Sequence, residues 1–389
     1  MQPKFHEVKR ASELAIVVGV QFGKIDDRAF SDSLEELKEL VYSAEAKVVG
    51  TLTQKRPSPD SRTFIGTGKV DELKSMKEAT GANLIVFDDM LSSAQVRNLE
   101  KELEIKVIDR GNLILDIFAK RATTSEAKIQ VELAQLQYLL PRLTNMWSHF
   151  SKQVGGIGTR GPGETQLEVD RRIIKTKIAT LKERLEKVDR QRATQRKRRQ
   201  DVYKIALVGY TNAGKSTVFN LLTKAGVWAD DLLFCTLDAV TRFLPLNSKN
   251  RIVISDTVGF IQKIPHELVA SFQSTLDEVR YADLLLHIVD ISHPNPIDHY
   301  EKTNAVLDEI GAGQVPRLLI LNKSDLISAE EIPSIDLNFP PAHIFSVSAK
   351  THVGMDNFLN FLTTFVEKEI GARMGIAKKT DGKARNSYR

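Results

Sequence analysis

The chain has 389 residues, of which 42% are hydrophobic and 27% charged, and its formal net charge is +5. These values are typical of folded proteins and exclude a wholly disordered chain, and the length predicts two or three domains. Its first residues lack the apolar core of a secretion signal, and no apolar run approaches the roughly 18–20 residues of a membrane span, so we expect a cytoplasmic protein without stable membrane insertion. The single cysteine, Cys235, excludes an intrachain disulfide and a cysteine-based zinc site, and we interpret it as a small, partly buried hydrophobe.

The first 120 residues alternate strand-like and helix-like patterns. Four apolar runs predict strands over residues 13–20, 47–54, 83–89 and 105–109, and amphipathic patterns predict helices over 33–44, 69–79 and 93–103. This alternation predicts a small N-terminal α/β domain, residues 1–120, with a largely parallel sheet. The segment Gly66–Val70 resembles a phosphate loop but has the wrong spacing, so we interpret it as the start of a helix.

Residues 121–200 carry two helical seams of apolar side chains. The first seam consists of Ile129, Leu133, Leu136, Leu140 and Leu143, and the second of Ile174, Ile178, Leu181, Leu185 and Val188. Two such stripes joined by a short connection predict an antiparallel helical hairpin.

The connection between the seams, residues 153–166, has five glycines within Gly155–Gly163. Such a loop is either a flexible tip or a backbone that presses closely against RNA or a nucleotide. Lys152, Arg160 and the cationic run Arg196–Arg199 are the suggested RNA contacts. The tail, residues 371–389, is basic, contains glycine, and is predicted to be disordered.

The third region of the chain, residues 201–370, contains a phosphate-binding motif. A buried strand pattern over 202–209 leads into "GYTNAGKST", which matches G-x-x-x-x-G-K-[ST] at Gly209, Gly214, Lys215 and Ser216. The glycines let backbone N–H groups face phosphate oxygens, the following helix N-terminus favours negative charge, and the Ser216 hydroxyl can bind Mg²⁺. The sequence therefore predicts a P-loop nucleotide hydrolase.

Further motifs follow in the order that a GTPase needs, so residues 201–370 are expected to be a GTPase domain. Asp256 ends a strand and can hold Mg²⁺ through water, and the Gly259 N–H can meet the γ-phosphate. Asn322, Lys323 and Asp325 follow another strand, where a carboxylate accepts hydrogen bonds from the N1–H and amino group of guanine that adenine does not offer. Ser348, Ala349 and Lys350 are expected beside the same base. Thr236 lies in a segment that can complete magnesium coordination while a γ-phosphate is present, although spacing alone leaves this assignment open.

These motifs resemble those of one known family along nearly the whole chain. "GGIGTRGPGETQLEVDRR", "LVGYTNAGKSTVFN", "LFCTLDAVTR" and "DTVGFI" together look like the HflX family of bacterial translation-associated GTPases. The resemblance implies an N-terminal α/β domain, a helical hairpin and a GTPase domain. It further implies binding to the large ribosomal subunit and its rRNA, with dissociation or rescue of stalled ribosomes, and Ser216 and Thr236 as magnesium ligands. ATP binding has been associated with the N-terminal domain of the family, but residues 1–120 contain no recognisable ATP motif.

We therefore expect a Mg²⁺-dependent GTP hydrolase that binds GTP and GDP, acts as a monomer and has no DNA partner. The expected catalytic residues are Lys215, Thr236 and Gly259, and the expected metal ligands are Ser216, Thr236 and Asp256. The expected nucleotide-binding residues come from four segments: Gly209, Tyr210, Thr211, Asn212, Ala213, Gly214, Lys215, Ser216 and Thr217; Phe234, Cys235, Thr236, Leu237 and Asp238; Asp256, Thr257, Val258 and Gly259; and Asn322, Lys323, Ser324 and Asp325 with Ser348, Ala349 and Lys350. Two competing functions are a signalling GTPase that binds a protein without RNA contact, and an ATP-driven RNA remodeller acting from the N-terminal domain.

Phe260 departs from the usual pattern of such switches, because a polar residue after the glycine usually aims the attacking water. A phenyl ring cannot orient water by hydrogen bonding, so another group must do so, either in the chain or in its partner. We accordingly predict slow intrinsic GTP hydrolysis that ribosomes accelerate. Asn212 in the phosphate loop either helps to bind K⁺ between the phosphates or only stabilises the loop.

Overall fold

The computed structural model describes residues 13–23, 26–146, 166–197, 202–224, 233–234, 236–246, 252–263, 273–328, 331, 339 and 343–385. The chain divides into two compact units. The first contains Met1–Asp189 together with Leu232–Phe234 and Gln262–Phe272, and the second contains Arg190–Asp231, Cys235–Ile261 and Gln273–Arg389. The Gly-rich loop, Lys152, Arg160, Arg198, Arg199 and Cys235 lie outside the described residues, and the expected domain boundaries stay predictions.

The first unit contains a four-stranded sheet in the order β2-β1-β3-β4, and every neighbouring pair is parallel. Its strands are β1 (Leu14–Phe22), β2 (Lys47–Arg56), β3 (Leu84–Phe87) and β4 (Lys106–Asp109), and its helices are α1 (Asp27–Ser43), α2 (Thr67–Thr80), α3 (Ser93–Leu103) and α4 (Arg110–Arg121). The interior of β1 is an almost continuous apolar run and is fully buried, as parallel sheets with helices on both faces require. The predicted α/β fold with a parallel sheet is confirmed.

Two segments of the first unit test particular expectations. Helix α2 begins at Thr67 with Gly66 as its N-cap, so the interpretation of Gly66–Val70 as a helix start is confirmed. Helix α4 was not predicted. It follows β4 without a loop, because the side chain of Asp109 accepts a hydrogen bond from the Asn112 N–H at 2.9 Å and caps the helix directly at the strand end.

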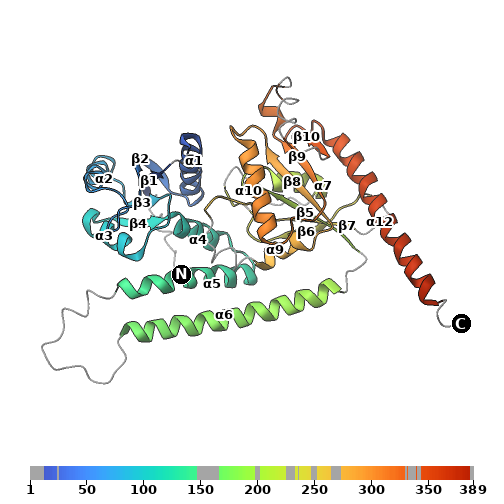
Figure 1. Ribbon diagram of the computed structural model, residues 1–389, viewed down its shortest axis with the longest axis horizontal. Helices are drawn as coiled ribbons and strands as arrows, with labels where there is room; N and C mark the ends of the chain where they lie inside the picture. The colour runs from blue at the N-terminus through green and yellow to red at the C-terminus, as the bar shows by residue number, and fades with distance from the viewer. Residues whose placement is uncertain are drawn as a thin grey trace, which may run out of the picture. The chain divides into compact units, whose positions relative to one another are not determined.

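Helices α5 (Ser125–Met146) and α6 (Gln166–Lys197) run side by side as the predicted hairpin (Figure 1). Leu133, Ile178 and Leu181 form its buried centre, and the partly buried members of both seams pack against them: Ile129, Leu136, Leu140, Ile174 and Leu185. The helical repeat of apolar residues therefore predicted the packing surface correctly for these eight side chains, whereas Leu143 and Val188 are not part of this cluster.

The second unit contains a six-stranded sheet in the order β10-β9-β8-β5-β7-β6. Its strands are β5 (Tyr203–Gly209), β6 (Val240–Phe243), β7 (Ile252–Asp256), β8 (Leu284–Asp290), β9 (Arg317–Asn322) and β10 (Ile344–Ser346). All neighbours are parallel except β6, the edge strand, which is antiparallel to β7. The carboxyl ends of β5, β7, β8 and β9 consequently meet at one edge of the sheet, where open α/β folds bind their ligands.

Helices α7 (Lys215–Thr223), α9 (Gln273–Arg280), α10 (Pro296–Glu309) and α12 (Met355–Arg385) accompany this sheet (Figure 1). Phe358, Leu362 and Val366 of α12 are buried in the same core as the strands. The prediction of a disordered tail is wrong for the residues up to Arg385, because α12 continues through them. Most residues of this stretch are alanine, lysine, arginine and methionine, which favour helix and outweigh its isolated glycines. In the part of the chain that the structure describes, no helix is long and apolar enough to cross a membrane.

Candidate functional site

The phosphate-binding motif forms the turn between β5 and α7. Gly209 and Gly214 have positive φ angles of 149° and 91°. A Cβ on Gly209 would lie 2.2 Å from the Ile288 carbonyl oxygen, and one on Gly214 would lie 2.2 Å from Nδ2 of Asn322. Only glycine therefore fits either position. Helix α7 begins after Gly214 without a side-chain cap, so its first N–H groups can bind an anion.

The Lys215 side chain is held inside this turn. It is 6% exposed, and its ammonium donates hydrogen bonds to the carbonyl oxygens of Tyr210 at 2.7 Å and Gly209 at 3.2 Å. The loop therefore carries a buried positive charge at the start of a helix, an arrangement suited to phosphate oxygens.

Ser216, Thr236 and Asp256 bring three oxygens together from α7, the segment before β6, and the end of β7. The Ser216 hydroxyl donates to Asp256 at 2.6 Å, the Thr236 hydroxyl donates to it at 2.9 Å, and the two hydroxyl oxygens lie 2.8 Å apart. Metal–oxygen bonds of about 2.1 Å at right angles place neighbouring ligands of an octahedral Mg²⁺ ion about 3.0 Å apart, close to the 2.8 Å between the Ser216 and Thr236 hydroxyl oxygens. These residues therefore fit a magnesium site.

Asp256 is the charged member of this group. It is fully buried, and one of its carboxylate oxygens, Oδ1, has no hydrogen-bond partner among the described residues. Burial raises the pKa of Asp256, and the hydrogen bond from Ser216 and the positive charge of Lys215 oppose that shift. A buried carboxylate with a spare oxygen is suited to a cation or to its bound water. Among the described residues, no group of three histidine, cysteine or acidic side chains offers another metal site.

Gly259 and Phe260 connect β7 to the phosphate-binding loop. The Phe260 N–H donates to the Gly209 carbonyl at 3.1 Å, and its carbonyl accepts from the Thr211 N–H at 2.8 Å. The Phe260 ring is 4% exposed and packs in the core with Val208, Leu285 and their neighbours. The side chain that would aim water in other switches is thus a core residue here.

The predicted base-recognition residues form one hydrogen-bonded group. Asn322 donates through Nδ2 to the Ala213 carbonyl at 2.9 Å and accepts through Oδ1 from the Ala349 N–H at 3.0 Å, so it connects the phosphate-binding loop to the segment after β10. The Ser348 hydroxyl donates to the exposed carboxylate of Asp325 at 2.6 Å. This hydrogen bond orients the carboxylate that the sequence predicted as the guanine acceptor.

Asp290 belongs to this group and was missed in the sequence. It ends β8 and forms an ion pair with Lys323 at 2.7 Å. Its position at the end of an apolar strand, between the strands that carry Asp256 and Asn322, was the available signal, because parallel strands end at the same edge.

Several expected nucleotide-binding residues lie elsewhere or have other partners. Phe234 belongs to the first unit, where its ring packs edge-to-face on Phe118 at 4.6 Å between centroids. The Thr257 hydroxyl is buried and donates to the Leu207 carbonyl at 2.6 Å. Leu237 is buried, whereas Thr217 and Lys350 are exposed. The remaining expected residues lie in the same segments as the site residues described above: Asn212, Asp238, Val258 and Ser324.

Family models match three consecutive regions of the chain. They are described as "GTP-binding GTPase N-terminal" for residues 31–119, "GTP-binding GTPase Middle Region" for 121–199 and "50S ribosome-binding GTPase" for 204–323.

Individual relatives extend over most of the chain. A protein named GTPase HflX from Caldanaerobacter subterraneus is 45% identical over 93% of this chain and 83% of its own length. The protein of the same name from Escherichia coli is 43% identical over 97% and 88%, respectively. The crystal structure of SsGBP in complex with GDP is similar with a TM-score of 0.53 and 25% sequence identity, over 92% of this chain and 99% of that one.

Proposed function

The chain belongs to the HflX family of GTPases and is a GTP hydrolase, and from this premise we propose that it acts on the large ribosomal subunit, dissociating or rescuing stalled ribosomes. The observation that carries this proposal is the match of residues 204–323 to the model described as a 50S ribosome-binding GTPase. Such a partner places the protein in the cytoplasm, where it would act as a monomer.

In this proposal Lys215 and the first N–H groups of α7 bind the β- and γ-phosphates, and the Gly259 N–H donates to the γ-phosphate. Asp325 accepts from guanine, held in position by Ser348. Ser216 and Thr236 would hold Mg²⁺ directly, and Asp256 would hold it through water. When bound, Mg²⁺ supplies positive charge that offsets the charge developing on the phosphates.

Thr236 connects the nucleotide to the rest of the molecule. Its hydroxyl contacts both Ser216 and Asp256, so it belongs to the group that would surround the metal. A segment held through metal and γ-phosphate is released after hydrolysis, which makes its conformation depend on the nucleotide. We propose that this dependence couples GTP to ribosome binding.

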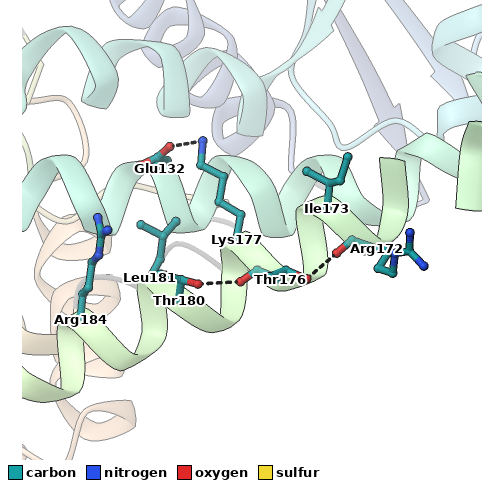
Figure 2. Close-up of a pocket in the computed structure, with 8 residues that line it drawn as sticks. All are labelled: Glu132, Arg172, Ile173, Thr176, Lys177, Thr180, Leu181 and Arg184. Atoms are coloured by element: carbon teal, nitrogen blue, oxygen red, sulfur yellow. Dashed lines mark hydrogen bonds and ion pairs between the residues drawn. The ribbon is translucent and has the colours of Figure 1, made fainter. Parts of the chain in front are cut away.

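A shallow groove on the helical hairpin supports contact with RNA (Figure 2). It has a volume of about 630 Å³ and lies along α6, and Arg172, Lys177 and Arg184 are the cationic residues that line it. Lys177 is paired with Glu132 of α5 at 2.5 Å, and the exposed Arg172 and Arg184 lie at either end of the groove. Cationic side chains that line one groove suit a phosphate backbone. Together with Lys152, Arg160 and Arg196–Arg199, this groove is the proposed rRNA surface.

Sedimentation with purified ribosomal subunits in GTP, GDP or a non-hydrolysable GTP analogue tests the proposal. We expect the protein to move with the large subunit in the GTP-like states, less so at higher salt, and GTP turnover to rise when large subunits are added. Equal turnover with and without subunits, together with no co-sedimentation, would instead favour a signalling GTPase whose partner is a protein.

A charge-reversal pair tests the groove itself. Arg172→Glu with Arg184→Glu should weaken co-sedimentation while GTP affinity stays unchanged. The matched control is Lys74→Glu with Lys101→Glu, which changes the charge equally at exposed helical positions of α2 and α3 in the same unit. If both double variants weaken co-sedimentation equally, ribosome binding depends on net charge alone, and the groove is not part of the rRNA surface.

A further inference from the structure

One hydroxyl of the phosphate-binding loop is buried without a partner. Thr211 is 7% exposed, and its Oγ1 makes no hydrogen bond with any described residue. A buried hydroxyl left in this state costs about 1–3 kcal/mol, so native proteins seldom keep one without a reason. A ligand that supplies the missing partner is such a reason.

The surroundings of Gly259 show where this side chain lies. A Cβ built on Gly259 would be 2.8 Å from the Lys215 ammonium, 2.8 Å from Thr211 Cα and 2.9 Å from Thr211 Cγ2. Thr211 therefore faces the Gly259 backbone and the Lys215 ammonium with its Cα and its methyl carbon, and a rotation about its Cα–Cβ bond places the hydroxyl where the methyl now lies. In phosphate-loop hydrolases the lysine and the switch glycine are directed at the terminal phosphate, so Thr211 lies beside that phosphate as well.

The same backbone pairing that places Thr211 removes the usual water-orienting side chain. The carbonyl of Phe260 accepts from the Thr211 N–H, while the Phe260 ring is buried in a core cluster with Val208 and Leu285. The ring offers no hydrogen bond to water, whereas a threonine hydroxyl donates one hydrogen bond and can accept others. Thr211 thus offers, next to the switch, the polar function that Phe260 lacks.

We propose that Thr211 is a catalytic residue of GTP hydrolysis: when GTP is bound, its side chain rotates, and its hydroxyl donates to an oxygen of the terminal phosphate and accepts from the attacking water. In this step the water oxygen forms a bond to the γ-phosphorus, and the bond from that phosphorus to the bridging oxygen breaks. The electron pair stays on GDP, and the proton of the water leaves with the released phosphate. The Thr211 hydroxyl keeps its own proton and acts by position alone.

Thr211→Val tests this assignment because valine has nearly the same shape and lacks the hydroxyl. We expect its single-turnover rate of GTP hydrolysis to fall by roughly tenfold or more, as for other donors that contact a transition state, with GDP affinity unchanged. Thr211→Ser should retain most of the wild-type rate. Thermal melting of each variant establishes that it folds, and Thr211→Ala replaces Thr211→Val should the latter not fold.

Thr303→Val is the matched control. Thr303 of α10 is also fully buried, and its hydroxyl is likewise without a partner among the described residues, but it belongs to none of the phosphate-binding segments. Its replacement should leave turnover unchanged. An unchanged rate in Thr211→Val overturns the proposal, as does an equal loss of GDP and GTP affinity, which would give the hydroxyl a role only in holding the loop. A loss of turnover in Thr303→Val as large as in Thr211→Val would overturn it too.

Discussion

Arg110 forms an ion pair with Asp88 at 2.7 Å, and both side chains are 1% exposed. Arg110 begins α4, Asp88 follows β3, and the same guanidinium also pairs with Glu36 of α1. Within the first unit Arg110 thus pairs with two buried carboxylates, and Lys263 pairs with Asp88 as well. A buried charge left without its partner is costly, so this arrangement makes Arg110 a determinant of the stability of the unit.

We expect Arg110→Met to lower the free energy of unfolding of the first unit by about 3–5 kcal/mol, because it removes a buried cation from Glu36 and leaves Asp88 to the partly exposed Lys263. Arg62→Met is the control, since Arg62 pairs with Glu102 at 2.5 Å but is 70% exposed, and its loss should cost less than about 1 kcal/mol. Denaturant unfolding measures both values. Equal losses in the two variants would contradict the role given to the buried network.

The hydrogen bond from Ser348 to Asp325 predicts that loss of the Ser348 hydroxyl weakens recognition of the guanine base and leaves the contacts to the phosphates unchanged. Without it, the Asp325 carboxylate loses its fixed orientation, so Ser348→Ala should weaken GTP and GDP binding equally, by roughly five- to tenfold. Titration calorimetry with both nucleotides measures this. A loss seen with GTP alone would place Ser348 at the phosphates instead of the base.

His287 makes the second unit sensitive to acid. It is fully buried in β8, neither of its nitrogens has a partner among the described residues, and it stacks on Tyr300 with 4.9 Å between ring centroids. Burial, with the charges of Arg317 and Lys215, lowers the pKa of His287 from 6.5 to about 3. Below about pH 6.5 the unfolded histidine binds a proton that the folded one does not. The buried neutral His287 therefore does not lower the free energy of unfolding above about pH 6.5, but the free energy of unfolding falls as the pH drops below that value, by up to about 1.4 kcal/mol per pH unit.

His287→Phe should preserve the stacking on Tyr300 and remove this dependence. We expect its unfolding free energy to fall less steeply than that of the wild-type protein between about pH 6.5 and 4, where the folded histidine stays neutral. His299, whose pKa burial and the charges of His293 and Lys302 also lower to about 3, contributes equally to both proteins. Parallel stability curves for the two proteins would contradict the prediction.

Asn212 has a positive φ of 59° within the phosphate-binding loop. If its amide helps to hold K⁺ between the phosphates, GTP turnover should be faster in potassium than in sodium at matched ionic strength, and Asn212→Ala should abolish that difference. If GTP turnover is the same in the two salts, Asn212 does not help to bind K⁺ and only stabilises the conformation of the loop.

The sequence determined what depends on neighbouring residues along the chain. Gly209, Gly214 and Lys215 were recognisable because the spacing of glycines and a lysine before a helix is itself what phosphate binding needs. The seams through Leu133 and Ile178 were recognisable because burial on one helix face repeats with the helical turn.

The tertiary structure decided what depends on residues distant in the sequence. Nothing local distinguishes Arg110 from a surface arginine, because its two partners come from α1 and from the end of β3. From the sequence, Phe260 indicated only that the usual water-orienting side chain is missing, whereas the fold shows that its ring packs in a core with Val208 and Leu285. The unpartnered state of the Thr211 hydroxyl likewise follows only when the loop, Gly259 and β7 are assembled. Local patterns report the conformation of a segment, whereas burial and partners are properties of the packed chain.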